Sequence, residues 1–219
     1  MSILQNLERI NHNIKFDSTK AVFVERKSLK TLNQLIFLGF EHFVKASSNI
    51  VKTGLKDKVN WHYVGKITFT NSFNIVKNFD YIHQRCLISN RIVNFWAKLL
   101  RKKLNIFLPL KYLIAYDLEA LKRIIINTNK LKNINIVGFS GIVNPIKVDK
   151  NVIYSFAKDQ FDNLKLYLYY SDIKLKYLSM GNMEDLNISS ANGGNFFILG
   201  NKLFQNSKNS ELVKDISNT

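Results

Sequence analysis

The segment from Pro109 to Pro145 constrains the fold more than any other part of the chain, because it reads as one strand–helix–strand unit. Residues 112–116 are a short apolar run of strand length. The residues that follow place apolar side chains on one helical stripe, namely Leu118, Leu121, Ile124, Ile125 and Thr128. Residues 134–139 form a second apolar run. Two apolar strands joined by an amphipathic helix predict parallel pairing through a right-handed crossover, and therefore an α/β fold.

The remaining elements are expected on both sides of this unit. Hydrophobic periodicity predicts further strands over residues 21–24, 59–63, 81–82 and 152–156, and helices over 3–10, 29–43, 73–77, 92–104 and 161–173. The Asn192-Gly193-Gly194 turn, followed by the apolar run 196–199, predicts a small hairpin. At 219 residues the chain has the length of one domain with extensions.

Signatures of catalysis are missing from the sequence. It contains neither of the glycine-rich phosphate loops that α/β enzymes use. Asp117 at a strand end could be a catalytic or ribose-binding acid, but the cap of the next helix is the preferred interpretation. Ser140 could touch a phosphate, although a plain turn is preferred. We therefore expect no enzyme, no catalytic residue and no cofactor.

Cysteine and histidine usage gives no metal site either. Cys86 is the only cysteine, so the chain has no internal disulfide and no thiolate zinc cluster. The four histidines (His12, His42, His62 and His83) are scattered and form no His-x3-His pair. We therefore expect no metal site.

The charge balance favours a polyanionic partner. The chain has 32 Lys and Arg against 16 Asp and Glu, which gives a net charge of +16. Such a charge attracts RNA, DNA or an anionic membrane through the release of condensed counterions. The alternative is a lysine-rich protein from an AT-rich genome, whose charges only face solvent. No run of 18 or more apolar residues is present, so no membrane span is expected.

The basic segment 85–103 is the strongest candidate for contact with RNA, because it contains no acidic residue. In helical projection Lys98, Arg101 and Lys102 share one face, whereas Lys103 points away. That face would follow a phosphate backbone while the opposite apolar face packs on the sheet. A solvated helix face is the alternative.

Several of these segments, taken in order, resemble the ribosomal protein S2 family of the small subunit. Residues 83–87 and 93–95 resemble the family's Arg-Trp-Leu, glycine and Leu-Thr-Asn-Phe sequence. Asp117, Glu119-Ala120 and the pair Asn144-Pro145 match the family's next strand–helix–strand unit. The resemblance extends from about Leu29 to Tyr177. Only residues 96–108 stand where family members carry a long coiled-coil hairpin, so that hairpin is expected to be reduced or absent.

The resemblance implies a flavodoxin-like (Rossmann-like) parallel sheet with helices on both faces. It divides the chain into an N-terminal extension over residues 1–28, an S2-like domain over 29–178 and a C-terminal extension over 179–219 with a hairpin and a mobile tail. It implies a structural constituent of the small ribosomal subunit near the head–body junction, which supports translation by binding ribosomal RNA and neighbouring ribosomal proteins. The residues expected to contact RNA are Arg85, Arg91, Asn94, Lys98, Arg101, Lys102 and Lys103.

The compositional bias and the eroded motifs favour an organelle-encoded member in the mitochondrial matrix over a plastid or bacterial one. Two other functions stay open at this point. One is a small α/β enzyme that acts on a phosphorylated metabolite, with Asp117 and Ser140 in the crevice at the strand ends. The other is a free-standing RNA-binding regulator.

Overall fold

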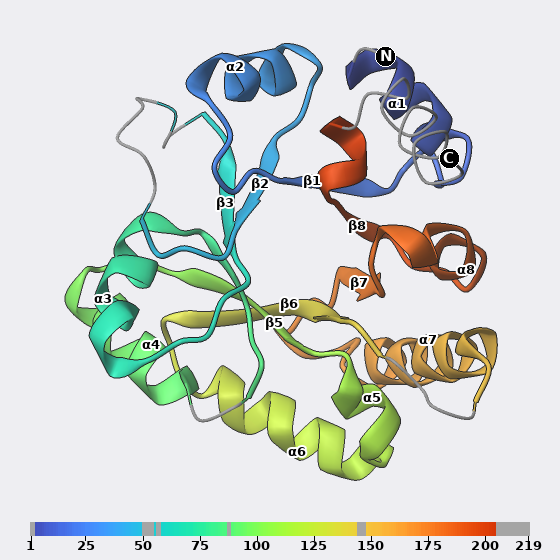
Figure 1. Cartoon of the computed structure of the whole chain (residues 1–219). Coiled ribbons are helices and arrows are strands. Elements are labelled where there is room, and N and C mark those ends of the chain that lie inside the picture. The colour runs from blue at the N-terminus through green and yellow to red at the C-terminus, as the bar shows by residue number, and fades with distance from the viewer. Residues whose placement is uncertain (1–2, 50–54, 56–57, 87–88, 144–147, 205–219) are drawn as a thin grey trace, which may run out of the picture.

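Eight strands form one parallel sheet that curls into a nearly closed barrel (Figure 1). The computed structural model describes residues 3–49, 55, 58–86, 89–143 and 148–204. The strands are β1 (Thr19–Phe23), β2 (His42–Lys45), β3 (Asn60–Tyr63), β4 (Tyr81–His83), β5 (Leu104–Pro109), β6 (Ile134–Gly141), β7 (Tyr177–Met180) and β8 (Phe196–Leu199). Their order along the sheet is β7-β6-β5-β4-β3-β2-β1-β8, and every neighbouring pair is parallel.

The two edge strands, β7 and β8, meet through an asparagine and not through a regular ladder. The Asn195 backbone N–H donates to the carbonyl of Leu178 at 3.0 Å. The Leu178 N–H in turn donates to the Asn195 side-chain oxygen at 2.7 Å. These two bonds satisfy edge groups that would otherwise be left unpaired, so one residue, through its backbone and its side chain, joins the two edges here.

Helices follow most strands and cover the outside of the barrel (Figure 1). They are α1 (Ile3–Asn11), α2 (Leu29–Phe37), α3 (Phe69–Asn78), α4 (Ser89–Leu99), α5 (Lys111–Ala115), α6 (Leu118–Asn129), α7 (Lys150–Tyr167) and α8 (Leu186–Ala191), with short 3-10 helices η1 (Met183–Asp185) and η2 (Asn201–Phe204). Parallel neighbours require such crossovers, because the chain must return to the same end of the sheet before each new strand.

The core has two layers, since each strand is buried on both faces. Outward side chains such as Ile136 and Phe139 on β6 join the large cluster beneath the helices. Inward side chains fill the barrel, namely Ala21, Val44, Phe107, Val137 and Phe196. This burial on both faces explains why the strands read as continuous apolar runs.

The predicted helix over residues 118–128 and the strand over 134–139 are confirmed as α6 and β6. Asp117 caps α6, because its carboxylate accepts the Ala120 N–H at 2.7 Å. The preferred capping interpretation of this acid is therefore confirmed. A cap of this kind typically contributes about 1 kcal/mol to stability.

Three predicted elements are wrong, and the helices predicted over 29–43, 92–104 and 161–173 run past the observed ends at Phe37, Leu99 and Tyr167. Residues 112–116 form helix α5 and the residue after it, and the preceding run 104–109 is the strand. Residues 152–156 lie within α7. A five-residue apolar run does not distinguish a strand from a buried helical turn by periodicity alone. The expected hairpin at 192–199 is also absent, because β8 pairs in parallel with β1.

The flavodoxin-like sheet with helices on both faces is wrong as a fold class. An open sheet needs helices on both faces, whereas this sheet curls so that one face becomes the filled interior of a barrel. The division at residues 28 and 178 stays a prediction; β1 and β8, from the two expected extensions, pair with each other. The Asn144-Pro145 pair and the tail from residue 206 lie outside the described residues.

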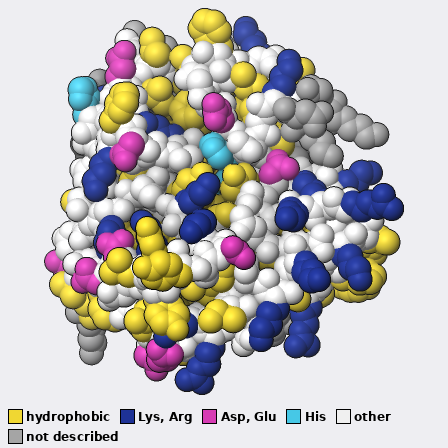
Figure 2. All heavy atoms as spheres, turned by 180° about the vertical axis from the view of Figure 1, so that it is seen from behind, with side chains coloured by type: hydrophobic (Ala, Val, Ile, Leu, Met, Phe, Trp, Pro, Cys, Tyr) yellow, Lys and Arg dark blue, Asp and Glu magenta, His cyan; other side chains and the backbone are white. Residues whose placement is uncertain are grey.

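Within the described residues, no helix is both long and apolar enough to cross a membrane. The surface is strongly basic in places. Lys and Arg side chains crowd the right-hand and lower parts of the face in Figure 2, while Asp and Glu lie mainly toward its left. Basic residues outnumber acidic ones in the whole chain, with 32 Lys and Arg against 16 Asp and Glu.

Candidate binding pocket at the mouth of the barrel

A pocket of about 780 Å³ lies at the carboxyl ends of the strands. Parallel strands bring all their carboxyl ends to one mouth, and barrels of this kind place their sites there. Apolar side chains make much of its wall, including Phe23, Val44, Val64, Leu110, Ile142 and Ile198. The polar groups in the lining are His83, Gln84, Arg85, Lys111, Ser140, Ser179, Asn182 and Glu184. An apolar cavity with a few polar groups is the usual form of a small-molecule site.

The charged groups of the pocket favour an anion. Arg85 follows β4 and Lys111 opens α5 after β5, and both are exposed. The Arg85 guanidinium also lies 3.5 Å from the carbonyl of Val64. Among the described residues of the lining, Glu184 is the one acid beside these two cations in the count of charges. The net charge of the lining is therefore positive.

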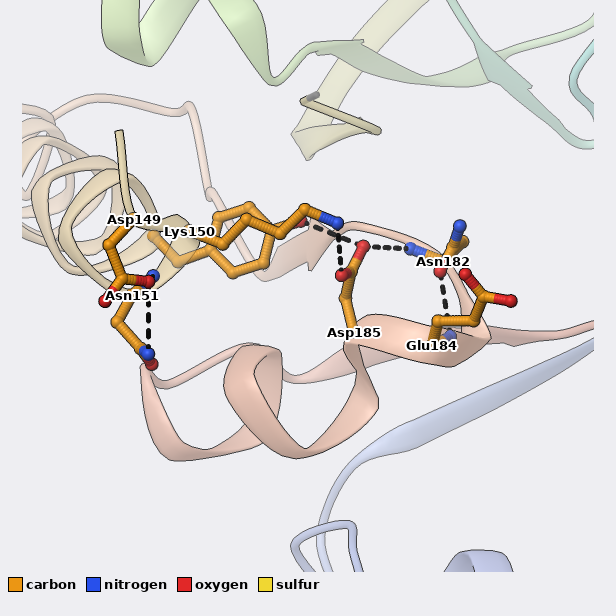
Figure 3. A network of polar contacts seen from close by, with 7 residues as sticks. Asp149, Lys150, Asn151, Asn182, Glu184 and Asp185 are labelled. Atoms are coloured by element: carbon orange, nitrogen blue, oxygen red, sulfur yellow. Dashed lines mark hydrogen bonds and ion pairs between the residues drawn. The ribbon is translucent and has the colours of Figure 1, made fainter. Parts of the chain in front are cut away.

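A polar network fixes the turn after β7, which forms one edge of the pocket (Figure 3). The Asp185 carboxylate accepts hydrogen bonds from the Lys150 amine at 2.7 Å, the Asn182 N–H at 3.2 Å and the Tyr154 hydroxyl at 3.3 Å. Gly181 has a φ of +80°, and a Cβ there would lie 2.4 Å from Asp185 Oδ2. Only glycine therefore fits between β7 and this carboxylate.

These contacts stabilise the ionised form of the Asp185 carboxylate. Burial opposes ionisation of the Asp185 carboxyl, but the hydrogen bonds from Lys150, Asn182 and Tyr154 outweigh it and lower its pKa. Burial and the neighbouring carboxylate raise the pKa of the Tyr154 phenol, which therefore stays a hydrogen-bond donor. The ionised carboxylate organises the turn, and the turn presents Asn182 to the pocket.

Three histidines and one serine form a continuous hydrogen-bonded row inside the barrel, which we call the histidine row. His42 Nδ1 lies 2.8 Å from His62 Nε2, and His62 Nδ1 lies 3.0 Å from His83 Nε2. His83 Nδ1 lies 2.8 Å from Ser140 Oγ. His42 is the first residue of β2, whereas His83 is the last residue of β4. The row therefore rises from the amino end of the barrel to the pocket, where His83 and Ser140 are part of the lining.

Aromatic rings hold the imidazoles of the row in place. The His62 ring stacks on Tyr81 with centroids 4.3 Å apart, and the His83 ring stacks on Phe107 at 4.2 Å. Burial lowers the pKa of His83 to about 3. Burial, and then the neighbouring imidazoles, lower the pKa of His62 well below its ordinary value. Burial also lowers the pKa of His42, against the opposing charge of Glu41. All three rings are therefore neutral at pH 7.

Gln84, the residue after β4, is part of the pocket lining and has one unsatisfied side-chain acceptor. Its side-chain nitrogen donates to the Asn90 side-chain oxygen. Its Oε1 atom is buried and has no hydrogen-bond partner. A buried unpaired acceptor costs about 1–3 kcal/mol, which a donor from a ligand would recover.

Sequence reasoning missed the histidine row, although a signal for it was present. His42, His62 and His83 are 20 and 21 residues apart, which is close to the length of one strand–helix repeat. Equal spacing at that length places side chains in successive strands. Ser140, expected in a plain turn, lies within β6. Among the described residues, no group of three or more His, Cys, Asp or Glu is arranged to hold a metal ion.

The helical face expected to contact RNA is not formed as predicted. Helix α4 ends at Leu99, so Lys98 lies on the helix while Arg101 follows it with a φ of +51°. The Lys102 amine turns back to the Asp80 carboxylate at 3.2 Å and to the carbonyl of Phe79. The predicted three-residue face is therefore wrong, because the helix ends before it is complete.

The other candidates lie in different places. Arg85 belongs to the pocket lining, and Arg91 is exposed on α4. The Asn94 side-chain oxygen accepts the Asn133 N–H at 3.2 Å, and Lys103 is exposed before β5. Contact of these side chains with RNA stays a prediction that the structure does not test.

Comparison with known proteins places the fold. No protein-family profile matches the chain. A curated relative, the pyridoxal phosphate homeostasis protein of Buchnera aphidicola subsp. Baizongia pistaciae, is 23% identical over 222 residues, which cover 91% of this chain and 94% of that protein. PipY of Synechococcus elongatus, solved with PLP (pyridoxal 5′-phosphate) bound, superposes with a TM-score of 0.77 at 19% identity and covers 93% of this chain and all of its own.

Alanine racemase of Clostridium difficile 630, in complex with cycloserine, superposes with a TM-score of 0.71 at 16% identity. The match covers 94% of this chain but only 56% of the racemase. The fold is thus the parallel barrel of these proteins.

These findings overturn the ribosomal interpretation. The resemblance to the S2 family is wrong, because the matches across nine-tenths of the chain are to a pyridoxal phosphate homeostasis protein and to PipY. A structural role in the small ribosomal subunit is wrong with it, as are ribosomal RNA and ribosomal proteins as partners. The mitochondrial assignment is also wrong, since these similar proteins come from bacteria. The motifs behind the resemblance are short strand ends, caps and helix starts, which any chain of alternating strands and helices contains.

Proposed function

We propose that this chain binds pyridoxal 5′-phosphate, or a close analogue, in the pocket at the mouth of the barrel and holds it without turning over a substrate. One observation carries the proposal. The pocket lies at the carboxyl ends of a barrel that superposes over 93% of this chain on PipY, which was solved with PLP bound. The Buchnera relative, whose name refers to pyridoxal phosphate homeostasis, supports the same ligand.

The residues of the pocket suit the parts of this ligand. Apolar walls such as Val64 and Ile198 suit the faces of a flat aromatic ring. The positive charges of Arg85 and Lys111 suit a phosphate. The unpaired Gln84 Oε1 suits a donor, such as a hydroxyl group or a protonated ring nitrogen. The residues present therefore fit the group.

Lys111 has a second role in this proposal. When bound, the cofactor supplies an aldehyde that condenses reversibly with primary amines. Among the described residues of the lining, Lys111 carries the amine that can take part. The apolar wall and the turn after β7 limit access of water to the ring. The chain's own residues thus bind and orient the ligand, and Lys111 retains it.

Equilibrium dialysis of the full chain against PLP, pyridoxal and inorganic phosphate tests the proposal. We expect PLP to bind more tightly than pyridoxal, because only the former presents a phosphate to Arg85. Arg85→Gln should weaken PLP binding about tenfold and leave pyridoxal binding nearly unchanged. Arg91→Gln is the matched control, since Arg91 is exposed on α4 and outside the pocket lining. Equal affinity for PLP and pyridoxal would contradict the proposal.

Borohydride reduction followed by peptide mass spectrometry tests the covalent part. The label should appear on Lys111 and vanish in Lys111→Gln. Label on another lysine would refute the role of Lys111 but not the binding. Turnover is tested separately, by following the chirality of amino acids incubated with the loaded protein. We expect no change, and measurable racemisation would replace the binding role with an enzymatic one.

A further inference from the structure

The hydrogens of the histidine row can be placed in only two ways if each contact is a hydrogen bond; we call these two placements solutions. Each neutral imidazole carries one N–H hydrogen and one bare nitrogen, and a serine carries one O–H hydrogen. The row of His42, His62, His83 and Ser140 therefore has four hydrogens for three contacts. Any arrangement in which the rings differ in tautomer leaves one contact without a hydrogen or puts two hydrogens in one contact. All three rings must therefore hold the same tautomer.

The two solutions run in opposite directions. In the first, the Ser140 hydroxyl donates to His83 Nδ1, and every ring carries its hydrogen on Nε2. In the second, every ring carries its hydrogen on Nδ1, and His83 Nδ1–H donates to Ser140 Oγ. Only in the second solution is the Ser140 hydroxyl hydrogen left to bond elsewhere. Burial keeps the imidazoles neutral, so a charged ring does not relax this rule.

We propose that Ser140 is a ligand-binding residue of the mouth pocket, and that the three histidines are positioning residues that make its hydroxyl a hydrogen-bond donor toward the ligand. Ser140 Oγ is part of a residue in the pocket lining, and His83 approaches the same oxygen at 2.8 Å. An anionic oxygen in the pocket accepts the Ser140 hydrogen, which selects the second solution along the whole row. The inference rests on the proposed function, because the acceptor would be the phosphate of PLP.

The bound ligand decides which of the two solutions the row adopts. An acceptor such as a phosphate oxygen takes the Ser140 hydrogen and selects the second solution, in which His83 donates to Ser140 Oγ. A group that only donates binds the Ser140 oxygen and selects the first solution, in which the serine donates to His83. The shared tautomer of the row therefore reports whether the bound group accepts from Ser140 or donates to it. The effect of the ligand reaches His42 at the opposite end of the barrel without any change in backbone position.

Nitrogen-15 NMR of the full chain with labelled histidines reads the tautomers directly. In the PLP-saturated protein we expect His42, His62 and His83 all to carry hydrogen on Nδ1. A ring with its hydrogen on Nε2 in that state would overturn the inference. In the free protein the three rings should share one tautomer or exchange together, and rings fixed in different tautomers would overturn it as well.

Substitutions of Ser140 test whether its hydroxyl binds the ligand. Ser140→Ala should weaken PLP binding about tenfold and abolish the change in tautomer on ligand addition. Ser140→Thr keeps the hydroxyl and should restore both, which excludes a purely structural effect. Ser72→Ala is the control for the tautomer readout, because Ser72 is a buried serine on α3 outside the pocket lining. If PLP fails to bind the unmodified chain, the proposed function fails, while a shared tautomer in the free protein would still support the row itself.

Discussion

Mild acid should destabilise this protein through the histidines inside the barrel. The pKa of His83 is about 3 in the folded chain, against 6.5 for an unperturbed histidine. The folded state therefore binds fewer protons than the unfolded state between these two values. The contribution to stability is complete above pH 6.5 and is lost as the pH falls toward 3. At pH 5 the loss from His83 alone is about 2 kcal/mol, because each pH unit below 6.5 costs about 1.4 kcal/mol.

The neighbouring rings steepen the same slope. The pKa values of His42 and His62 are lowered too, so unfolding takes up protons at these rings as well. Below pH 6.5 the free energy of unfolding should therefore fall by more than the roughly 1.4 kcal/mol per pH unit that one histidine gives. Between pH 7 and pH 5 the pH dependence of stability comes from the histidines and not from the carboxylates. The lowered pKa values of Glu25 and Asp185 act only at more acidic pH, since their unperturbed values are 4.5 and 3.8.

Urea denaturation at pH 7, 6 and 5 measures this effect. The dependence on pH should be shallower in His83→Gln than in the unmodified chain, by about 1.4 kcal/mol per pH unit. His12→Gln is the matched control, because His12 is exposed and lies outside the barrel strands. It should keep the full slope. An unchanged slope in His83→Gln would show that His83 is not buried and neutral, and the reasoning would fail.

Two further substitutions test the turn and the barrel. Asp185→Ala removes the acceptor shared by Lys150 and Tyr154 and should cost about 2–4 kcal/mol of stability in urea. Asp162→Ala breaks the partly exposed pair with Lys158 and should cost less than about 1 kcal/mol. Equal losses would contradict the assigned burial. Gly138→Ala should destabilise by at least about 2 kcal/mol, because its Cβ would lie 1.9 Å from the Tyr177 carbonyl oxygen across β6 and β7. Gly200→Ala meets only Met183 at 3.9 Å and should be tolerated, so a stable Gly138→Ala protein would argue against this strand pairing.

Local structure was predictable where one signal dominated. Helix α6 carries an apolar stripe long enough to show its period, and Asp117 is a strong cap. Strand β6 is a long apolar run. Helix α5, by contrast, is five residues long, which is too short for periodicity to separate a helix from a strand. The strand was therefore predicted over residues 112–116, which form α5, and not over 104–109, which form β5.

The site was less predictable, because its parts are distant in sequence. His83 and Ser140 are 57 residues apart and meet only because β4 and β6 both neighbour β5. In the sequence His83 is one of four scattered histidines, and nothing near it in the chain indicates a partner. The spacing of the three histidines was visible, yet its meaning depends on knowing that successive strands lie side by side in a barrel.

The sequence by itself determined the α/β class, the parallel pairing and the excess of positive charge. These follow from apolar patterns, caps and counts that act within about 30 residues. The tertiary structure decided whether the sheet stays open or closes. Closure depends on pairing between β1 and β8 and on the Asn195 bonds to β7, contacts that join segments from opposite ends of the chain. Such contacts leave no local pattern, because a buried parallel strand looks the same in an open sheet and in a barrel.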